Sequence, residues 1–226
     1  MATGLMNRRF RLKLLSLTMF AGTACSHNSP APPPRIPQVV LVHGIFENGK
    51  RFGTFKNHLE ARGFECFVPV LDHPDGRGGL ENLAAGLKRD IDKRFGPDSP
   101  ISIVGFSMGG IVSRHYLQHL GGAGRCENLI TISSPHHGTV MGWAYPSRGA
   151  AQMRPESPFL AELARSEDRL GNMRVTSLRT PMDLIIVPPK SSVWDRAENL
   201  EYPVILHPLM LESRQVIADV EQRLLE

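Results

Sequence analysis

The sequence predicts an α/β fold with a mostly parallel central sheet and helices on both faces. Short apolar runs such as residues 39–42 and 101–104 are typical of fully buried parallel strands. Between them, apolar residues recur at helical spacing, for example over residues 80–95. Strands that alternate with helices form parallel sheets through crossover connections. The chain has 226 residues, 41% of them hydrophobic, so it can bury a sizeable core, and we expect one folded domain.

The expected elements follow one another from residue 39 onward. Apolar spacing predicts a helix over residues 52–62, which Gly63 would end. The next strand, over residues 64–70, contains Pro69, which favours an edge position because proline cannot donate to a neighbouring strand. Further helices are predicted over residues 80–95, 111–120, 155–169 and 213–225, and further strands over 101–104, 128–132, 173–178 and 202–206.

The first 37 residues have the composition of a targeting segment and a linker. Four basic residues precede an apolar run over residues 14–20 and small residues up to Cys25, an order typical of a signal segment. We therefore expect a signal segment over residues 1–25, a tether rich in Pro and Ser over 26–37, and the folded domain over 38–226. Export to the periplasm, a membrane or the medium would follow, and an uncleaved leader is the alternative.

Residues 22–25, Gly-Thr-Ala-Cys, resemble a bacterial lipoprotein signal. The resemblance implies a membrane tether through Cys25, with ordinary cleavage nearby as the alternative.

Of the 26 basic residues, four lie in the leader, which leaves 22 to balance the 22 acidic ones. A balanced domain without basic runs interleaved with aromatic residues is not expected to bind nucleic acid.

Residues 105–109, Gly-Phe-Ser-Met-Gly, are the motif that indicates chemistry. A strand is predicted directly before Ser107 and a helix directly after it, which is the context of a nucleophile elbow. The glycines permit the sharp turn and leave only the serine hydroxyl projecting into the site. The helix that follows points free backbone N–H groups at a developing oxyanion. The motif therefore predicts a serine hydrolase with Ser107 as the nucleophile.

A serine hydroxyl needs a base that takes its proton and a carboxylate that orients this base. In parallel sheets such groups gather at the carboxyl ends of the strands. His207 follows the predicted last strand, and Asp183 follows the strand before it. We therefore expect Asp183 and His207 to complete a triad with Ser107. Asp195 and Glu198 are the alternatives for the acid.

Two backbone N–H groups, those of Ile45 and Met108, are expected to form the oxyanion hole. Met108 directly follows the nucleophile, and Ile45 lies in the loop after the first central strand. Gly44 would let this loop approach the substrate closely. We therefore expect His43, Gly44 and Phe46 to border the substrate pocket, although a His-Gly pair can also simply end a strand.

His115 and His119 lie four residues apart on a predicted helix, a spacing that can bind a metal ion. No third ligand is evident in the sequence. We interpret both histidines as helix-surface or packing residues, and we expect neither a metal nor another cofactor.

Five segments of the chain resemble the α/β-hydrolase superfamily, and within it the compact bacterial triacylglycerol lipases and esterases. They are residues 43–45, 105–110, 134–139, 157–160 and 183–188. The order Ser, Asp, His along the chain is also that of α/β-hydrolases. The resemblance implies that residues 135–139 border the pocket, which places His136 there without a catalytic role. Residues 141–145, including Trp143, could form a short apolar flap over an acyl chain or simply pack.

The strand order of that superfamily also bears on the two cysteines of the domain. It implies that two strands separate Cys66 from Cys126, which corresponds to about 14 Å at the usual strand spacing. This separation is too large for a disulfide. We therefore expect two buried free thiols.

The functional hypothesis from the sequence is hydrolysis of carboxylic esters with apolar acyl chains through an acyl-enzyme. Acyl transfer and thioester cleavage are alternatives, because another nucleophile or another leaving group can use the same intermediate. A non-catalytic tethered binding module with this fold is a third hypothesis.

Overall fold

A six-stranded parallel sheet forms the centre of the domain. The computed structural model describes Met1 and residues 35–226, and residues 35–226 form one compact unit. The sheet has the order β2-β1-β3-β4-β5-β6, and every neighbouring pair is parallel, which confirms the predicted fold class. The strands are β1 (Gln38–Val42), β2 (Glu65–Phe67), β3 (Ile101–Phe106), β4 (Cys126–Ile132), β5 (Arg174–Arg179) and β6 (Glu198–Glu201).

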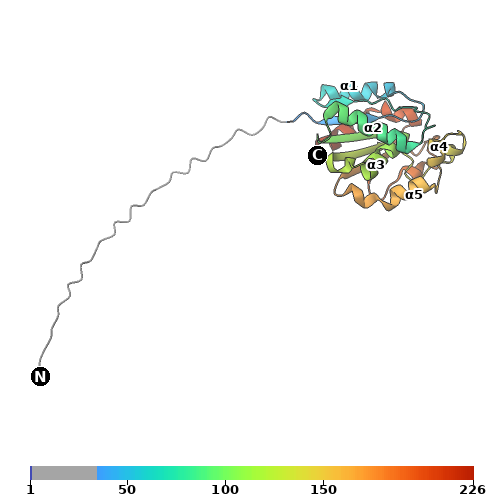
Figure 1. Cartoon of the computed structure of the whole chain (residues 1–226). Helices are drawn as coiled ribbons and strands as arrows, with labels where there is room; N and C mark the ends of the chain where they lie inside the picture. The colour runs from blue at the N-terminus through green and yellow to red at the C-terminus, as the bar shows by residue number, and fades with distance from the viewer. Residues whose placement is uncertain (2–34) are drawn as a thin grey trace. The chain divides into compact units, whose positions relative to one another are not determined.

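The helices cover both faces of the sheet (Figure 1). They are α1 (Gly53–Ala61), α2 (Leu80–Phe95), α3 (Met108–His119), α4 (Arg148–Gln152), α5 (Pro158–Arg165) and α6 (Arg214–Leu225). One hydrophobic cluster joins the sheet to α2, α3 and α5, and a second joins it to α1 and α6. Both clusters contain strand residues, because successive side chains of a strand point to opposite faces.

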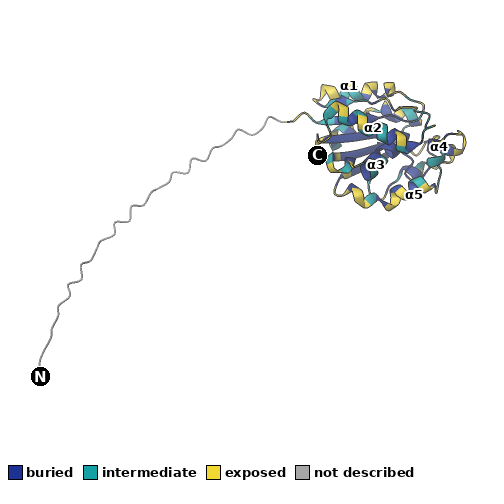
Figure 2. Ribbon diagram, in the orientation of Figure 1, coloured by how far each residue is buried: buried dark blue, intermediate teal, exposed yellow. Residues whose placement is uncertain are grey.

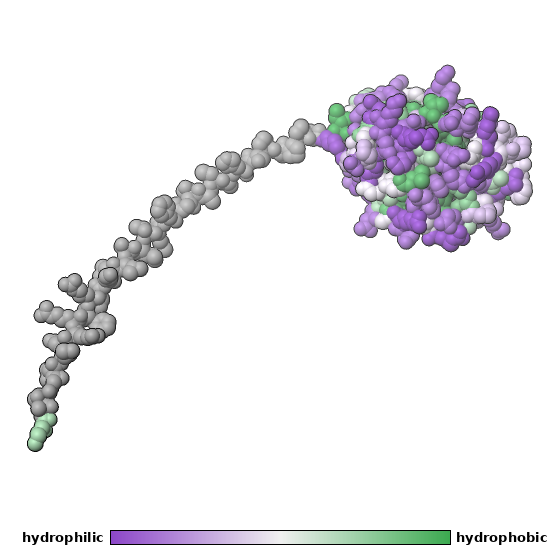
Figure 3. Space-filling model, viewed as in Figure 1, coloured by the Kyte–Doolittle hydropathy of each residue, from purple (hydrophilic) through white to green (hydrophobic). Residues whose placement is uncertain are grey.

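The central strands are buried on both sides, which explains why they have continuous apolar sequences. All six residues of β3 are buried, and Figure 2 shows the strands of the sheet as the most buried part of the domain. The face of the domain seen in Figure 3 is mostly hydrophilic, and its apolar side chains lie in small separate patches. An apolar cavity lies at the carboxyl ends of the strands and is described below.

The position of β2 and of the two cysteines agrees with the sequence. β2 lies at one edge of the sheet, as Pro69 predicted. Cys66 lies in β2 and Cys126 in β4, so that β1 and β3 separate them. Their side chains also belong to different hydrophobic clusters. Both cysteines are buried and free, as expected.

The predicted strand over residues 202–206 is wrong. The last strand is β6, four residues earlier, which pairs Leu200 with Leu178 of β5. Pro203 has no N–H to continue the ladder, and Ile205 and Leu206 are 68% and 44% exposed. β6 has a polar sequence because it lies at the edge of the sheet and is largely exposed.

The predicted helix over residues 155–169 is also shorter than expected. α5 ends at Arg165, and a separate 3-10 helix follows over Glu167–Leu170. The predicted signal segment, Cys25 and the tether up to residue 34 lie outside the described residues. None of the helices in the described part of the chain is long and apolar enough to cross a membrane.

Candidate active site

Ser107 occupies the turn between β3 and α3. Its backbone has φ 54° and ψ −124°, a conformation that is strained for any residue with a side chain. The turn is held by the Ser107 N–H, which donates to Ile132 O of β4 at 2.8 Å. A Cβ on Gly105 would lie 2.6 Å from Gly110 Cα, so only glycine fits before the nucleophile. The chain therefore forms the elbow that the motif predicted.

His207 and Asp183 form a buried pair. His207 Nδ1 lies 2.7 Å from Asp183 Oδ2. The other carboxylate oxygen, Oδ1, accepts the N–H groups of Ile185 and Ile186, both at 2.9 Å. Three donors thus fix the orientation of the acid, and the imidazole is oriented by it in turn.

The surroundings of Asp183 keep its carboxylate ionised. Burial alone raises the pKa of Asp183, but the hydrogen bond and charge of His207, with the two backbone N–H groups, bring the pKa below its usual value. The carboxylate therefore accepts the Nδ1 proton of His207, which leaves Nε2 free to accept a proton. Of the alternative acids, Asp195 is exposed and Glu198 pairs with Arg223 instead.

Ser107 and His207 line the same cavity, which has a volume of about 230 Å³. The Phe106 ring packs against the imidazole, with the ring centres 4.7 Å apart. In residues 35–226, no hydrogen bond joins the Ser107 hydroxyl to His207. Such a bond often forms only when substrate is bound.

The loop after β1 passes directly beside the nucleophile. A Cβ on Gly44 would lie 3.1 Å from Ser107 Cβ, so the glycine permits this approach. Ile45 lines the cavity, whereas the N–H of Phe46 is already occupied by Pro74 O at 2.9 Å. Neither the Ile45 nor the Met108 N–H donates to an acceptor among the described residues, and their role in an oxyanion hole stays a prediction.

Ser107 also lines a second, apolar cavity of about 330 Å³. This acyl cavity, as we name it, shares Ile45, Ser107 and Ile185 with the first. Most of its other side chains are apolar, and they come from four loops and from α4. They are Phe46, Pro135, Thr139, Met141, Gly142, Ala144, Tyr145, Ala150, Met153 and Ile186. The nucleophile therefore lies at the junction of a mainly apolar cavity and a smaller, more polar one.

Of the predicted pocket residues, Gly44 and Phe46 line these cavities, and His43 does not. His43 is fully buried, its Nε2 accepts the Leu71 N–H at 3.0 Å, and its Nδ1 lies 2.9 Å from Gly44 O. Burial lowers its pKa despite the hydrogen bond to Gly44. A neutral His43 therefore connects the loops after β1 and β2 and does not line either cavity, so its prediction as a pocket residue is wrong.

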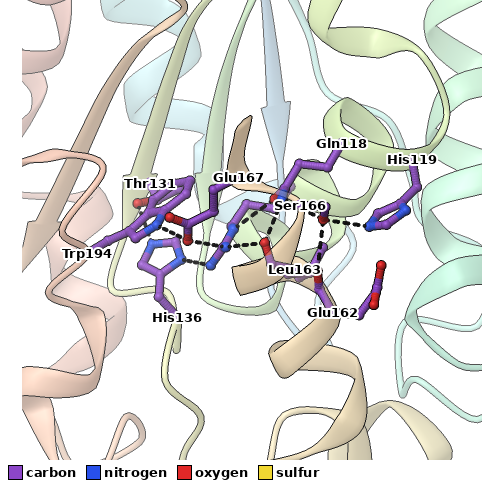
Figure 4. Close-up of polar contacts among 10 residues, drawn as sticks. Gln118, His119, Thr131, His136, Glu162, Leu163, Ser166, Glu167 and Trp194 are labelled. Carbon is purple, nitrogen blue, oxygen red and sulfur yellow. Dashed lines mark hydrogen bonds and ion pairs between the residues drawn. The ribbon is translucent and has the colours of Figure 1, made fainter. Parts of the chain in front are cut away.

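The prediction for His136 is also wrong, because its side chain lies behind the cavity wall. Figure 4 shows the ring in a buried polar network, where Arg114 Nη1 donates to Nδ1 at 3.2 Å and Nε2 donates to Thr131 at 3.0 Å. The ring stacks on Trp194, with the centres 4.5 Å apart. Its neighbour Pro135 lines the acyl cavity instead.

Trp143 points away from the cavity that its neighbours line. It is 67% exposed, and the Arg154 guanidinium lies over its ring at 3.8 Å. Met141, Gly142, Ala144 and Tyr145 of the same segment do line the acyl cavity. The predicted flap thus forms a wall of the cavity, but the tryptophan does not contribute to it.

His115 and His119 stack on each other on α3, with the ring centres 4.8 Å apart. His115 also stacks on Phe159, and His119 contacts Ser166. The described residues contain no cluster of three or more metal-ligating side chains. The surroundings of these two histidines are those of packing residues.

Comparisons with known proteins show the family and the fold of the chain. The sequence model of the palmitoyl protein thioesterase family matches residues 38–163, more than half of the chain. The chain belongs to the palmitoyl protein thioesterase family. The match contains Ser107 and both oxyanion positions. Asp183 and His207 lie beyond it, so their assignment depends on the geometry.

Among curated members, the mouse (Mus musculus) lysosomal thioesterase PPT2 is 26% identical to this hydrolase-family chain over 145 residues. The aligned part is 60% of this chain and 46% of PPT2, so the chain spans about half the length of the curated relative.

Two solved lipases share the fold, which confirms the predicted resemblance to α/β-hydrolases. Mature lipase BlEst2 of Bacillus licheniformis superimposes with a TM-score of 0.70 at 17% identity, covering 86% of this chain and 94% of BlEst2. Aspergillus fumigatus lipase B gives a TM-score of 0.70 at 16% identity, covering 84% of this chain and 53% of the lipase.

Several residues of this thioesterase-family site were not predicted from the sequence. Glu47 and Arg51 line the smaller cavity and pair with each other at 3.2 Å. Ala150 and Met153 line the acyl cavity. Glu47 lies two residues after Ile45 and could have been considered on that ground. Nothing in the local sequence marks Ala150 or Met153 as cavity residues.

Proposed function

We propose that this protein is a serine hydrolase that cleaves esters of apolar acyl groups through an acyl-enzyme on Ser107. The observation that supports this most is the position of Ser107. It lies between an apolar cavity suited to an acyl chain and a cavity that it shares with the Asp183–His207 pair. The membership of the thioesterase family supports the same class of reaction.

The reaction would proceed in two halves. His207 Nε2 takes the Ser107 proton as Oγ attacks the carbonyl carbon, and the N–H groups of Ile45 and Met108 stabilise the oxyanion. Collapse breaks the bond to the leaving group, which takes the proton from His207. Water then attacks the acyl-enzyme with His207 again as the base, and the carboxylic acid leaves while Ser107 regains its proton. Asp183 stabilises the imidazolium in both halves.

A thioester is the second candidate substrate, favoured by the family match. A thiol has a pKa of about 8.5, so a thiolate leaves with less help from His207 than an alkoxide needs. The same residues would act in the same order. Thioester and oxygen-ester cleavage therefore differ in the leaving group and not in the catalytic groups.

The experiment compares purified wild-type protein with Ser107→Ala on acyl esters and acyl thioesters of matched chain length. Ser113→Ala is the matched control, since Ser113 is a buried serine of α3, the helix that follows Ser107. It donates to Gly109 O at 2.7 Å and lines neither cavity. We expect Ser107→Ala to lose hydrolysis and labelling by a fluorophosphonate, and Ser113→Ala to keep both. Activity retained in Ser107→Ala would contradict the proposal. Absence of labelling in the wild type would favour a non-catalytic binding module.

We also propose that the protein is exported and tethered through Cys25, on the basis of the sequence order in residues 1–25. Metabolic labelling with a radioactive fatty acid should then give a labelled protein in the membrane fraction, and Cys25→Ser should lose both the label and the attachment. Unlabelled protein in the soluble exported fraction would instead indicate ordinary cleavage.

A further inference from the structure

We infer that α4 limits the acyl group to about ten carbons, with Ala150 and Met153 as the specificity-determining residues. The inference rests on the proposed function, because it concerns the chain that the acyl cavity receives. It gives the enzyme a medium-chain preference, shorter than the sixteen carbons of a palmitoyl group.

The volume of the acyl cavity gives the limit. The cavity measures about 330 Å³. A water molecule takes about 30 Å³ in the liquid and a methylene group is of similar size, so the cavity holds about eleven such groups. The reacting carbonyl at Ser107 takes one of these places. An acyl group of about ten to eleven carbons, its carbonyl carbon included, therefore fills the cavity, and the carbons of longer chains stay outside it.

The wall formed by α4 is fixed at both ends. Its N-cap residue Ser147 accepts the Ala150 N–H at 3.1 Å. The Gly149 N–H donates to Gly76 O at 2.8 Å, and Gln152 Oε1 accepts the Leu80 N–H at 2.7 Å. These contacts connect α4 to the loop before α2 and to the first residue of α2. A longer acyl chain therefore cannot easily push α4 aside.

The segment after α4 is fixed in the same way. Thr139 N–H donates to Met153 O at 2.8 Å, and Arg154 Nε donates to Gly142 O at 3.0 Å. Met153 is buried and lines the acyl cavity together with Thr139 and Met141. The backbone of α4 and of the segment after it is thus hydrogen-bonded to its neighbours, which favours a constant volume of the cavity.

Because α4 also borders a third cavity, the chain offers a matched pair of positions. Ala150 lines the acyl cavity, whereas Ala151 lines a cavity of about 500 Å³ with His115 and Phe159. A leucine at position 150 would take up the room of about three carbons in the acyl cavity. A leucine at position 151 would add the same group on the same helix but in the other cavity.

The test measures kcat/KM for a series of acyl thioesters and oxygen esters from four to sixteen carbons, each below its micelle concentration. In the wild type we expect kcat/KM to rise by up to about fourfold per methylene, and to stop rising at about ten carbons. Ala150→Leu should shift the chain length at which kcat/KM stops rising, which we call the break, to about seven carbons. Ala151→Leu should leave the break unchanged. Met153→Ala should move it to about thirteen.

The outcomes separate this inference from the proposed function. If Ser107-dependent hydrolysis is absent for every chain length, the proposed function fails. If hydrolysis occurs but kcat/KM keeps rising to sixteen carbons, or Ala150→Leu and Ala151→Leu shift the break equally, the chain-length limit is wrong. If Ala150→Leu does not fold, Met153→Ala still tests the inference. Its expected result is higher activity on longer chains, which a loss of folded protein cannot produce.

Discussion

Gly109, in the first turn of α3, lies against Val42, the last residue of β1. A Cβ on Gly109 would be 2.2 Å from the Val42 carbonyl oxygen, closer than any real contact allows. The start of α3 can therefore approach the end of β1 only because residue 109 has no side chain. This approach brings the loop with Ile45 beside Ser107 and Met108. The last glycine of the motif thus permits the close approach that the predicted oxyanion hole requires.

Gly109→Ala should accordingly destabilise the protein by about 1 to 3 kcal/mol, because the added methyl group forces α3 away from β1. Chemical denaturation gives the free energy of unfolding. Gly86→Ala in α2 is the control, since a Cβ there would meet only Arg89 Nη2 at 3.6 Å. That variant should gain about 0.5 to 1 kcal/mol from the helix preference of alanine. Equal effects of the two substitutions would contradict the close approach.

Asp183→Asn should lower kcat on the order of 10³- to 10⁴-fold and leave the fold unchanged. The asparagine oxygen can still accept the N–H groups of Ile185 and Ile186. Its amide group, however, would donate to His207 and stabilise the tautomer that cannot accept the Ser107 proton. Steady-state kinetics with a soluble acyl ester measures the loss. Glu198→Gln should keep wild-type kcat, and the reverse result would make Glu198 the acid.

His136 should make the protein less stable as the pH falls from 7 to 5. Burial, and then the charge of Arg114, hold the pKa of His136 well below its usual value. His136 is therefore protonated near pH 6.5 in the unfolded chain, but it stays neutral at this pH in the folded protein. The stability is complete above this pH and decreases below it, by up to about 1.4 kcal/mol per pH unit.

Thermal melting across this pH range tests the role of His136. His136→Gln should give a shallower pH dependence than the wild type. His43 and His115, whose pKa values burial also lowers, contribute the remaining slope. His73→Gln, in an exposed loop, serves as the control. An unchanged slope in His136→Gln would mean that the network accepts the protonated ring.

The two thiols of the domain should be unreactive until the protein unfolds. Burial raises the pKa of Cys66 and of Cys126 to about 12, so almost no thiolate is present at pH 8. In a Cys25→Ser variant, Ellman's reagent should titrate no thiols in the native protein and two in denaturant. Rapid reaction of one thiol before unfolding would place that cysteine nearer the surface.

The sequence predicted the parts of the fold whose burial follows a simple pattern. The amphipathic run over residues 80–95 corresponds to α2, and the apolar runs correspond to the central strands. The prediction of a strand over residues 202–206 failed, because Ile205 and Leu206 there are apolar but exposed. The actual edge strand, β6, was missed because its sequence is polar. Apolar composition indicates burial only where the chain packs, and an edge strand or an exposed loop breaks this relation.

Some features of the candidate site were likewise predictable from the sequence, and others were not. The pairing of Asp183 with His207 was predicted, although the strand assumed directly before His207 does not exist. The two residues lie in the loops after β5 and β6, which are parallel neighbours and end at the same edge of the sheet. Their catalytic roles stay predictions until tested. The orientations of His136 and Trp143 were not predictable. Each side chain contacts an arginine from another element or loop, Arg114 of α3 in one case and Arg154 after α4 in the other. Local sequence does not specify which partner a loop side chain finds.

The positions of Cys66 and Cys126 on opposite faces of the sheet have a practical consequence. Because the native domain contains no disulfide, its folding requires neither an oxidant nor a disulfide isomerase. The domain should be obtainable in equal yield from reducing and oxidising hosts, and dithiothreitol in the purification buffers should leave its melting temperature unchanged.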